Sequence, residues 1–393
     1  MKWDRFARAS RVTPAALVAV VLLASAGYAE DSGNFVVMLG QDTTAVEHYT
    51  RTASELVVDQ VSRAPRVLQR HFTYGFSKGV LTKFTMVVTP AGSATPTQTI
   101  EANFGADSMR IRTQSGSAPA ANAAMVLPSG TLVVPNSSPW GQYENQIMKL
   151  VQSKQDSLRT PLWFVGSSST NWISVSRLGR DSVALVTDRR DVFHVRVDKA
   201  GHILGVLPIA GTGKYGVERV ASLDLNAMTA AFAAREQSGT GLGTLSPRDT
   251  VRVASAGGAA LMIDYGRPAK RGRVVFGDVV PYGEVWRTGA NVATQFKSDK
   301  TLDFGGTLVP AGFYTVWTLP TANGWKLIIN SETGQWGTAH KAEKDLYTIE
   351  MKVSALPQPV ERFTIGVDAT EKGGTLNLDW DTTRASAAFT TQP

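Results

Sequence analysis

Hydrophobic and polar residues alternate along much of this chain, and a period of two predicts β-strands rather than helices. The turn sequence Gly40-Gln41-Asp42 separates two such runs, at 35–39 and 43–52. Further runs of this kind predict strands at 68–76, 80–88, 172–178, 182–187, 192–197 and 202–209. Strands joined by short turns pair antiparallel, so residues 30–236 predict an N-terminal antiparallel β-meander or open barrel.

Two segments of this N-terminal part have helical spacing instead. One follows Ser138, which can cap a helix, and has Pro139 at its first helical position. Its apolar stripe comprises Tyr143, Ile147, Leu150 and Val151. The other segment, 225–236, is rich in alanine and closes this part of the chain. One or two helices on a mainly β domain give an α+β class.

The second half alternates more cleanly, with one face apolar and the other polar. The apolar face is formed by Trp325, Leu327, Ile329, Tyr347, Ile349, Met351, Leu376, Leu378 and Trp380. We therefore predict a C-terminal antiparallel β-sandwich or small barrel over 249–384. A Gly/Ser linker at 237–248 precedes it, and a tail at 385–393 follows it.

Composition limits the class of protein. With 43% hydrophobic and 19% charged residues, the chain of 393 residues can form packed cores and is not a disordered protein. Cysteine is absent, which excludes disulfides, thiolate metal sites and cysteine nucleophiles.

The first 29 residues have the pattern of a signal peptide. Lys2 and three arginines precede a short apolar core at 14–26, and small residues suited to cleavage follow. The apolar core is too short for the roughly 20 residues of a membrane span, so no transmembrane segment is expected after cleavage. We expect a periplasmic or secreted protein. Removing residues 1–29 lowers the net charge from +7 to +4, which gives no nucleic-acid footprint.

One motif suggests a cofactor site, but the residues around it do not support that interpretation. Residues 211–216, GTGKYG, match a dinucleotide-binding fingerprint, but the following residues alternate like a strand rather than opening a helix. A glycine-rich loop in a meander is the expected structure. The five histidines show no metal-site spacing, so we predict neither a metal nor a cofactor.

Carboxylates offer a route to an enzyme. Asp379 and Asp381 flank Trp380 and share a face, either as an acid/base pair or as the solvent side of a strand. A hydrolase acting on envelope material with carboxylates such as Asp264 or Asp381 is the alternative function. The lack of a nucleophile elbow or a phosphate-binding loop weighs against an enzyme, although carboxylate hydrolases need neither.

Arginines and aromatic residues are concentrated at 264–291. Guanidinium groups hold carboxylates or phosphates, and aromatic rings offer flat faces for a sugar. The candidate ligand-binding residues are Tyr265, Arg267, Tyr282, Trp286, Arg287 and Asn291. In the structural alternative, Arg287 pairs with Glu284 or Asp264, Trp286 fills the core and Asn291 satisfies a turn.

The same region resembles a known family of exported bacterial proteins, domain-of-unknown-function family 2911. The resemblance runs from about 260 to 367 and is carried by DYGRP at 264–268, KRGR at 270–273, VPYG at 280–283, WRTGAN at 286–291 and LVPAG at 308–312. It implies an exported β domain and assigns no activity or catalytic residue. The N-terminal part is unassigned.

These patterns favour an exported binding module for a small polar or anionic ligand, a glycan or an envelope protein. A purely structural or assembly component is a further alternative.

Overall fold

The computed structural model describes residues 31–135, 139–187 and 191–392, so the predicted signal peptide lies outside the described residues. Strands predominate in it, which confirms the mainly β class. No helix in these ranges is long and apolar enough to cross a membrane.

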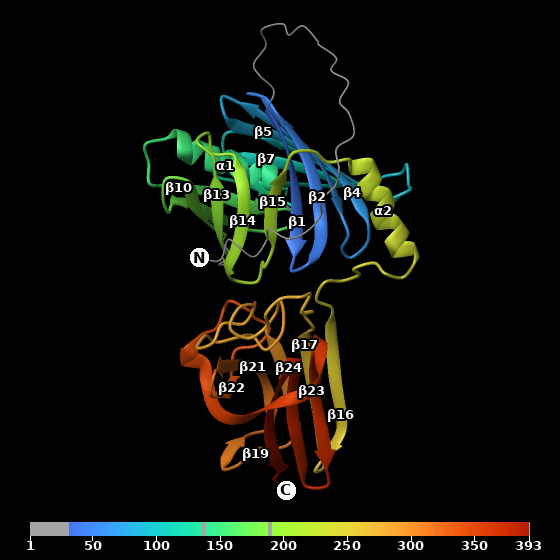
Figure 1. The fold of residues 1–393 in the computed structure, drawn as a ribbon, viewed down its shortest axis with the longest axis vertical. Coiled ribbons are helices and arrows are strands. Elements are labelled where there is room, and N and C mark those ends of the chain that lie inside the picture. The colour runs from blue at the N-terminus through green and yellow to red at the C-terminus, as the bar shows by residue number, and fades with distance from the viewer. Residues whose placement is uncertain (1–30, 136–138, 188–190, 393) are drawn as a thin grey trace, which may run out of the picture.

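The N-terminal part, the upper body in Figure 1, forms one sheet of fifteen strands. The strand order is β8-β7-β6-β5-β4-β3-β2-β1-β15-β14-β13-β12-β11-β10-β9. Neighbouring strands are antiparallel, except that β9 and β10 run parallel. The strands are β1 (Asp31–Leu39), β2 (Asp42–Arg51), β3 (Glu55–Ser62), β4 (Leu68–Ser77), β5 (Val80–Pro90), β6 (Gln98–Phe104), β7 (Ser108–Ser115), β8 (Ala121–Val126), β9 (Leu132–Val134), β10 (Ser157–Phe164), β11 (Thr170–Arg177), β12 (Ser182–Val186), β13 (Val192–Val197), β14 (Ile203–Ala210) and β15 (Gly216–Val220). The predicted meander is confirmed, and β8 and β9 form its two edges.

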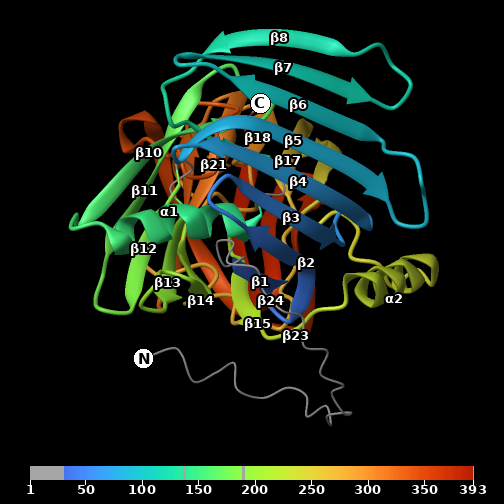
Figure 2. The same cartoon turned by 90° about the horizontal axis from the view of Figure 1, so that it is seen from above.

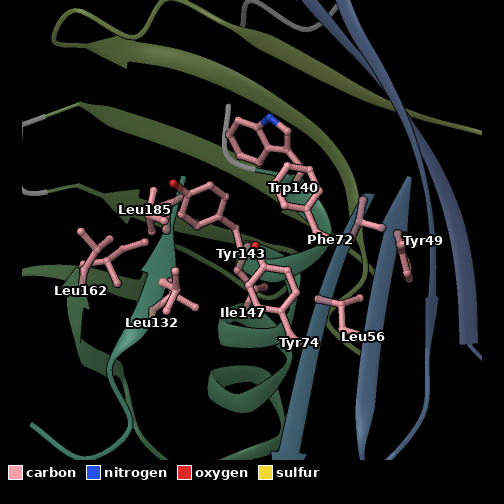
Figure 3. Close-up of a cluster of buried hydrophobic side chains, with 14 of the residues drawn as sticks. Tyr49, Leu56, Phe72, Tyr74, Leu132, Trp140, Tyr143, Ile147, Leu162 and Leu185 are labelled. Carbon is pink, nitrogen blue, oxygen red and sulfur yellow. The ribbon is translucent and has the colours of Figure 1, made fainter. Parts of the chain in front are cut away.

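The sheet curves around helix α1 (Trp140–Gln152), which lies inside the curve (Figure 2). Figure 3 shows Tyr143 and Ile147 of this helix packed among aliphatic and aromatic side chains of the sheet. The predicted stripe therefore faces the core. The helix begins one residue later than predicted, because Pro139 is its N-cap, and Ser138 lies outside the described residues.

Helix α2 (Leu225–Gln237) lies against the outer face of the sheet. Asp224 caps it by accepting the Ala227 N–H at 2.9 Å. Its buried Phe232 packs with Val46, Val61 and Val67 in a small cluster separate from the main core. The helix predicted at 225–236 is confirmed.

The C-terminal part forms a sheet of nine strands in the order β16-β17-β18-β21-β22-β23-β24-β19-β20. The elements are β16 (Arg248–Ala256), β17 (Ala259–Gly266), β18 (Thr294–Ser298), β19 (Leu302–Phe304), β20 (Thr307–Val309), β21 (Gly312–Thr321), β22 (Gly324–Asn330), the 3-10 helix η2 (Ala342–Lys344), β23 (Asp345–Thr370) and β24 (Gly373–Thr391). The register shifts twice along β23, and β16 contacts both β23 and β24, so the sheet folds back into a sandwich-like fold. The fold is confirmed as antiparallel and sandwich-like.

The predicted tail at 385–393 is wrong. Strand β24 continues to Thr391 and pairs Ala385 with Val353 and Thr391 with Leu302. Ala385, Ala387 and Phe389 alternate into the core, so burial of one strand face holds this segment in the sheet.

The two sheets meet at their loops. The Gln41 N–H donates to the Arg271 carbonyl oxygen at 3.0 Å, and Arg271 forms an ion pair with Asp42 at 2.5 Å. Gly40 has φ +63°, and a Cβ there would lie 2.2 Å from the Arg271 carbonyl oxygen. The β1–β2 turn therefore lies directly against the loop after β17.

Candidate functional site

A cavity of about 360 Å³ lies where the loops of the two sheets meet, and we call it the basic pocket. Lys214 from the β14–β15 loop, Arg273 from the loop after β17 and Arg287 from the WRTGAN segment line it. Asn291, Thr212 and Ser246 add polar groups, and none of its described lining residues is an Asp or Glu. The pocket thus collects positive charge from both sheets.

The WRTGAN segment is fixed on the C-terminal sheet by backbone pairing. Trp286 and Thr318 exchange N–H···O bonds of 2.7 and 2.9 Å. The buried Thr294 hydroxyl donates to the Thr288 carbonyl oxygen at 2.6 Å. The Trp286 ring stacks on Trp380 at 5.9 Å and meets Phe363 at 5.0 Å. The residue before Arg287 is thereby anchored in the aromatic core.

Arg287 has a partly exposed side chain whose Nε is buried and has no hydrogen-bond partner among the described residues. Burial lowers its pKa to about 10, and the attraction of Asp191 opposes this shift. No ion pair joins Arg287 to Glu284 or Asp264, because Asp264 is held by Arg248 at 2.9 Å. The pairing proposed in the structural alternative is therefore not the one observed.

Gly337 makes room for this arginine. A Cβ on Gly337 would lie 2.0 Å from the Arg287 Cδ and 2.4 Å from the Asn291 carbonyl oxygen. The Gly337 N–H donates to that same carbonyl at 2.8 Å, and Asn291 has a positive φ of 62°. The turn places Arg287 and Asn291 on the wall of one pocket.

The basic cluster at 267–273 is mostly neutralised. Arg267 pairs with Asp249 at 3.0 Å and Lys270 with Asp381 at 2.6 Å, while Arg271 pairs with Asp42. The acceptors given for Arg273 among the described residues are carbonyl oxygens: its Nε donates to Lys270 at 3.0 Å and another guanidinium N–H donates to Ala269 at 2.6 Å. Burial and the neighbouring Arg271 lower its pKa to about 10.

Lys214 lies in the GTGKYG segment, whose backbone N–H groups donate to the carboxylate of Asp191. The Asp191 carboxylate accepts the N–H groups of Thr212 and Gly213 at 2.5 and 2.8 Å. Strand β15 follows directly, so the expected glycine-rich loop of a meander is confirmed. Burial and the positive charges of Arg287 and Arg273 lower the pKa of Lys214, and the negative charges of Asp278 and Glu284 oppose this shift.

The two arginines of the basic pocket stay charged at neutral pH, since both have pKa values of about 10. Like charges gathered away from water repel one another, and an anion between them would remove that repulsion. The pocket therefore has the electrostatics of an anion site.

The structure separates the six candidate residues. Trp286, Arg287 and Asn291 line the basic pocket. Tyr265 is buried in the core, where its hydroxyl oxygen accepts the Ile365 N–H, and Arg267 is bound to Asp249. Tyr282 is 47% exposed and lies outside the pocket lining.

Sequence reasoning missed Lys214 and Arg273 as site residues. Both lie in motifs visible in the sequence, GTGKYG and KRGR, but the similarity of the first to a dinucleotide-binding fingerprint does not point to its lysine. The one sequence feature that could have indicated Lys214 is its position within a glycine-rich loop.

The candidate catalytic carboxylates are held in separate ion pairs. Arg248 binds Asp264, Lys270 binds Asp381, and Arg384 binds Asp379 at 2.6 Å. Each carboxylate therefore faces its own cation rather than a second candidate carboxylate. Across 31–135, 139–187 and 191–392, no three His, Asp or Glu side chains gather as metal ligands would.

A second, larger cavity of about 980 Å³ lies inside the curve of the N-terminal sheet, and we call it the apolar cavity. Most of its lining side chains are apolar, including Met86, Val88, Ile100, Ile111, Met125 and Trp163.

A family model matches the C-terminal sheet. The model of DUF2911, a family of unknown function, matches residues 246–389, which confirms the resemblance and leaves the N-terminal sheet unassigned. No curated protein matches the chain.

Two solved structures are similar at a distance. A DUF1089 family protein from Pseudomonas aeruginosa is 11% identical with a TM-score of 0.32, over 50% of this chain and 98% of that one. A β-barrel-like protein of DUF1849 from Brucella abortus is 11% identical with a TM-score of 0.27, over 48% of this chain and 94% of that one. Scores this low carry no argument about function.

Proposed function

We propose that this protein is an exported binding protein that holds a small anionic ligand in the basic pocket. The observation that carries the proposal is Arg287, whose buried Nε has no hydrogen-bond partner among the described residues and which shares the pocket wall with Lys214 and Arg273. A buried N–H without an acceptor is costly, and a phosphate or carboxylate ligand would supply both an acceptor and a negative charge.

The test is thermal unfolding of the mature chain in phosphate, with chloride of equal ionic strength as the reference. A ligand bound only by the folded state stabilises it by about 2.7 kcal/mol at 100 times its dissociation constant. We expect phosphate to raise the midpoint of the wild type. Arg287→Ala and Lys214→Ala should abolish that rise, whereas Arg252→Ala, at an exposed arginine on β16, should retain it.

The unliganded midpoints separate this proposal from the structural alternative. Removing one of three mutually repelling charges should leave the midpoint of Arg287→Ala unchanged or higher. A loss of about 3–5 kcal/mol would instead mark an internal partner, as for a broken buried ion pair. If phosphate and small carboxylates leave every midpoint unchanged, the pocket is not an anion site and a structural or assembly role is favoured.

Export is part of the proposal and is supported by the signal-like pattern of residues 1–29. N-terminal sequencing of protein from the envelope fraction should give a start near Gly27 or Glu30. An intact Met1 in a membrane pellet would contradict it.

A further inference from the structure

The basic pocket adjoins the apolar cavity. Four residues line both of them: Ala64, Pro65, Tyr215 and Leu245. Leu245 belongs to the segment between the sheets, and Tyr215 directly follows Lys214. The charged pocket and the apolar cavity thus meet at a shared wall.

The two cavities differ in chemistry. The charged residues that line the apolar cavity in the described ranges are Arg70 and Asp191. The Asp191 carboxylate is taken up by backbone amides of the adjacent loop, and Arg70 donates to the Ser62 hydroxyl oxygen. Away from these residues the wall is mainly aliphatic and aromatic, so this cavity favours an apolar occupant.

We infer that the ligand is an amphiphile, with its carboxylate or phosphate head in the basic pocket and its apolar tail in the apolar cavity. The inference rests on the proposed function for the position of the head. Tyr215 and Leu245 line both cavities, so the ligand would pass from one to the other beside these two side chains.

The volume of the apolar cavity fits this assignment. About 980 Å³ lies at the upper end of the roughly 300–1,000 Å³ found for small-molecule sites. The basic pocket alone, at about 360 Å³, suits a head group. The tail of such a molecule would displace water from the apolar wall. Its anionic head would reduce the repulsion among the cations.

Calorimetric titration of the mature chain with octanoate, decanoate and dodecanoate, each below its micelle concentration, tests the inference. Each methylene buried in the cavity should tighten binding about fourfold, the equivalent of roughly 0.8 kcal/mol. Dodecyl phosphate should bind as dodecanoate does, and inorganic phosphate should compete with both.

A matched pair of variants on β8 tests where the tail lies. Ala123 lines the apolar cavity yet is exposed at the sheet edge, so a tryptophan there can fill space without unfolding the core. Val126 is 79% exposed on the opposite face of the same strand and outside the cavity lining. Ala123→Trp should lower dodecanoate affinity toward that of octanoate and leave phosphate binding intact, whereas Val126→Trp should change neither.

The outcomes separate the two proposals. Phosphate binding that is lost in Arg287→Ala, with affinity independent of chain length, would overturn the amphiphile and keep the anion site. Chain-length dependence that persists unchanged in Arg287→Ala would overturn the anion site and the position of the head. If Arg70→Gln abolishes dodecanoate binding and Arg287→Ala does not, the head lies inside the apolar cavity and the proposed orientation is wrong.

Discussion

Glu47 on β2 is a buried acid whose titration should control the stability of the N-terminal sheet. Its side chain is fully buried, and its carboxylate accepts the Gly141 N–H at 3.0 Å and the Gln60 amide at 3.2 Å. Helix α1 has no side-chain cap of its own, so Glu47 serves its first turn from the sheet. Burial, with a smaller contribution from Glu144, raises the pKa of Glu47 from 4.5 to about 7 despite these hydrogen bonds.

The sign of the pH dependence follows from this shift. The folded state holds the Glu47 proton more tightly than the unfolded state does, so this group stabilises the fold most below pH 4.5. That contribution is lost as the pH rises through about 7. A shift of this size corresponds to about 3 kcal/mol, at roughly 1.36 kcal/mol per pH unit.

Glu47→Gln keeps an acceptor for Gly141 and removes the charge. We expect its free energy of unfolding, measured in urea, to gain on that of the wild type by about 3 kcal/mol between pH 4.5 and pH 8. Subtracting the wild-type value at each pH cancels the other titrating groups. Glu55→Gln, at an exposed glutamate on β3, is the control and should give a constant difference. A constant difference for Glu47→Gln, or one that shrinks as the pH rises, would refute this account.

Three further predictions concern the C-terminal sheet and the linker. Phe389→Ala should lower the free energy of unfolding by about 3–5 kcal/mol, because the ring is buried. An unchanged urea midpoint would show that residues 385–393 behave as a tail. Gly337→Ala should cost about 1–3 kcal/mol in the same assay, since its methyl group would overlap the Arg287 side chain; a neutral result would show that the turn can relax. Limited proteolysis should first cut at 239–243 and release two folded fragments, and fragments that unfold on separation would contradict independent folding.

Strand positions were predictable because each strand buries one face. Tyr347, Ile349 and Met351 alternate with charged or polar residues, and the period alone identifies β23. The end of the last strand, 385–391, was not predicted because its inward face includes Ala385 and Ala387, whose small side chains give a weak signal next to serine and threonine. Only pairing with β23 and β19 shows that this segment belongs to the sheet.

The candidate site was predictable only where it is local. Trp286, Arg287 and Asn291 lie within one turn, so their spacing could place them together. Lys214 belongs to a different sheet, and no local pattern could bring it to Arg287. The sequence of a basic cluster also does not show which of its side chains form ion pairs with carboxylates of the same chain.

The basic pocket is defined by which nearby cations are paired with carboxylates and which are not. The carboxylates of Asp42, Asp249 and Asp381 neutralise three of the four cations at 267–273. The Asp191 carboxylate attracts Arg287 and also accepts two backbone N–H groups of the adjacent loop. The positive charge that remains is therefore concentrated at the junction of the sheets, next to the apolar cavity. Asp191, Asp278 and Glu284 offset part of this charge, and the part that remains supports the proposal that an anion binds there.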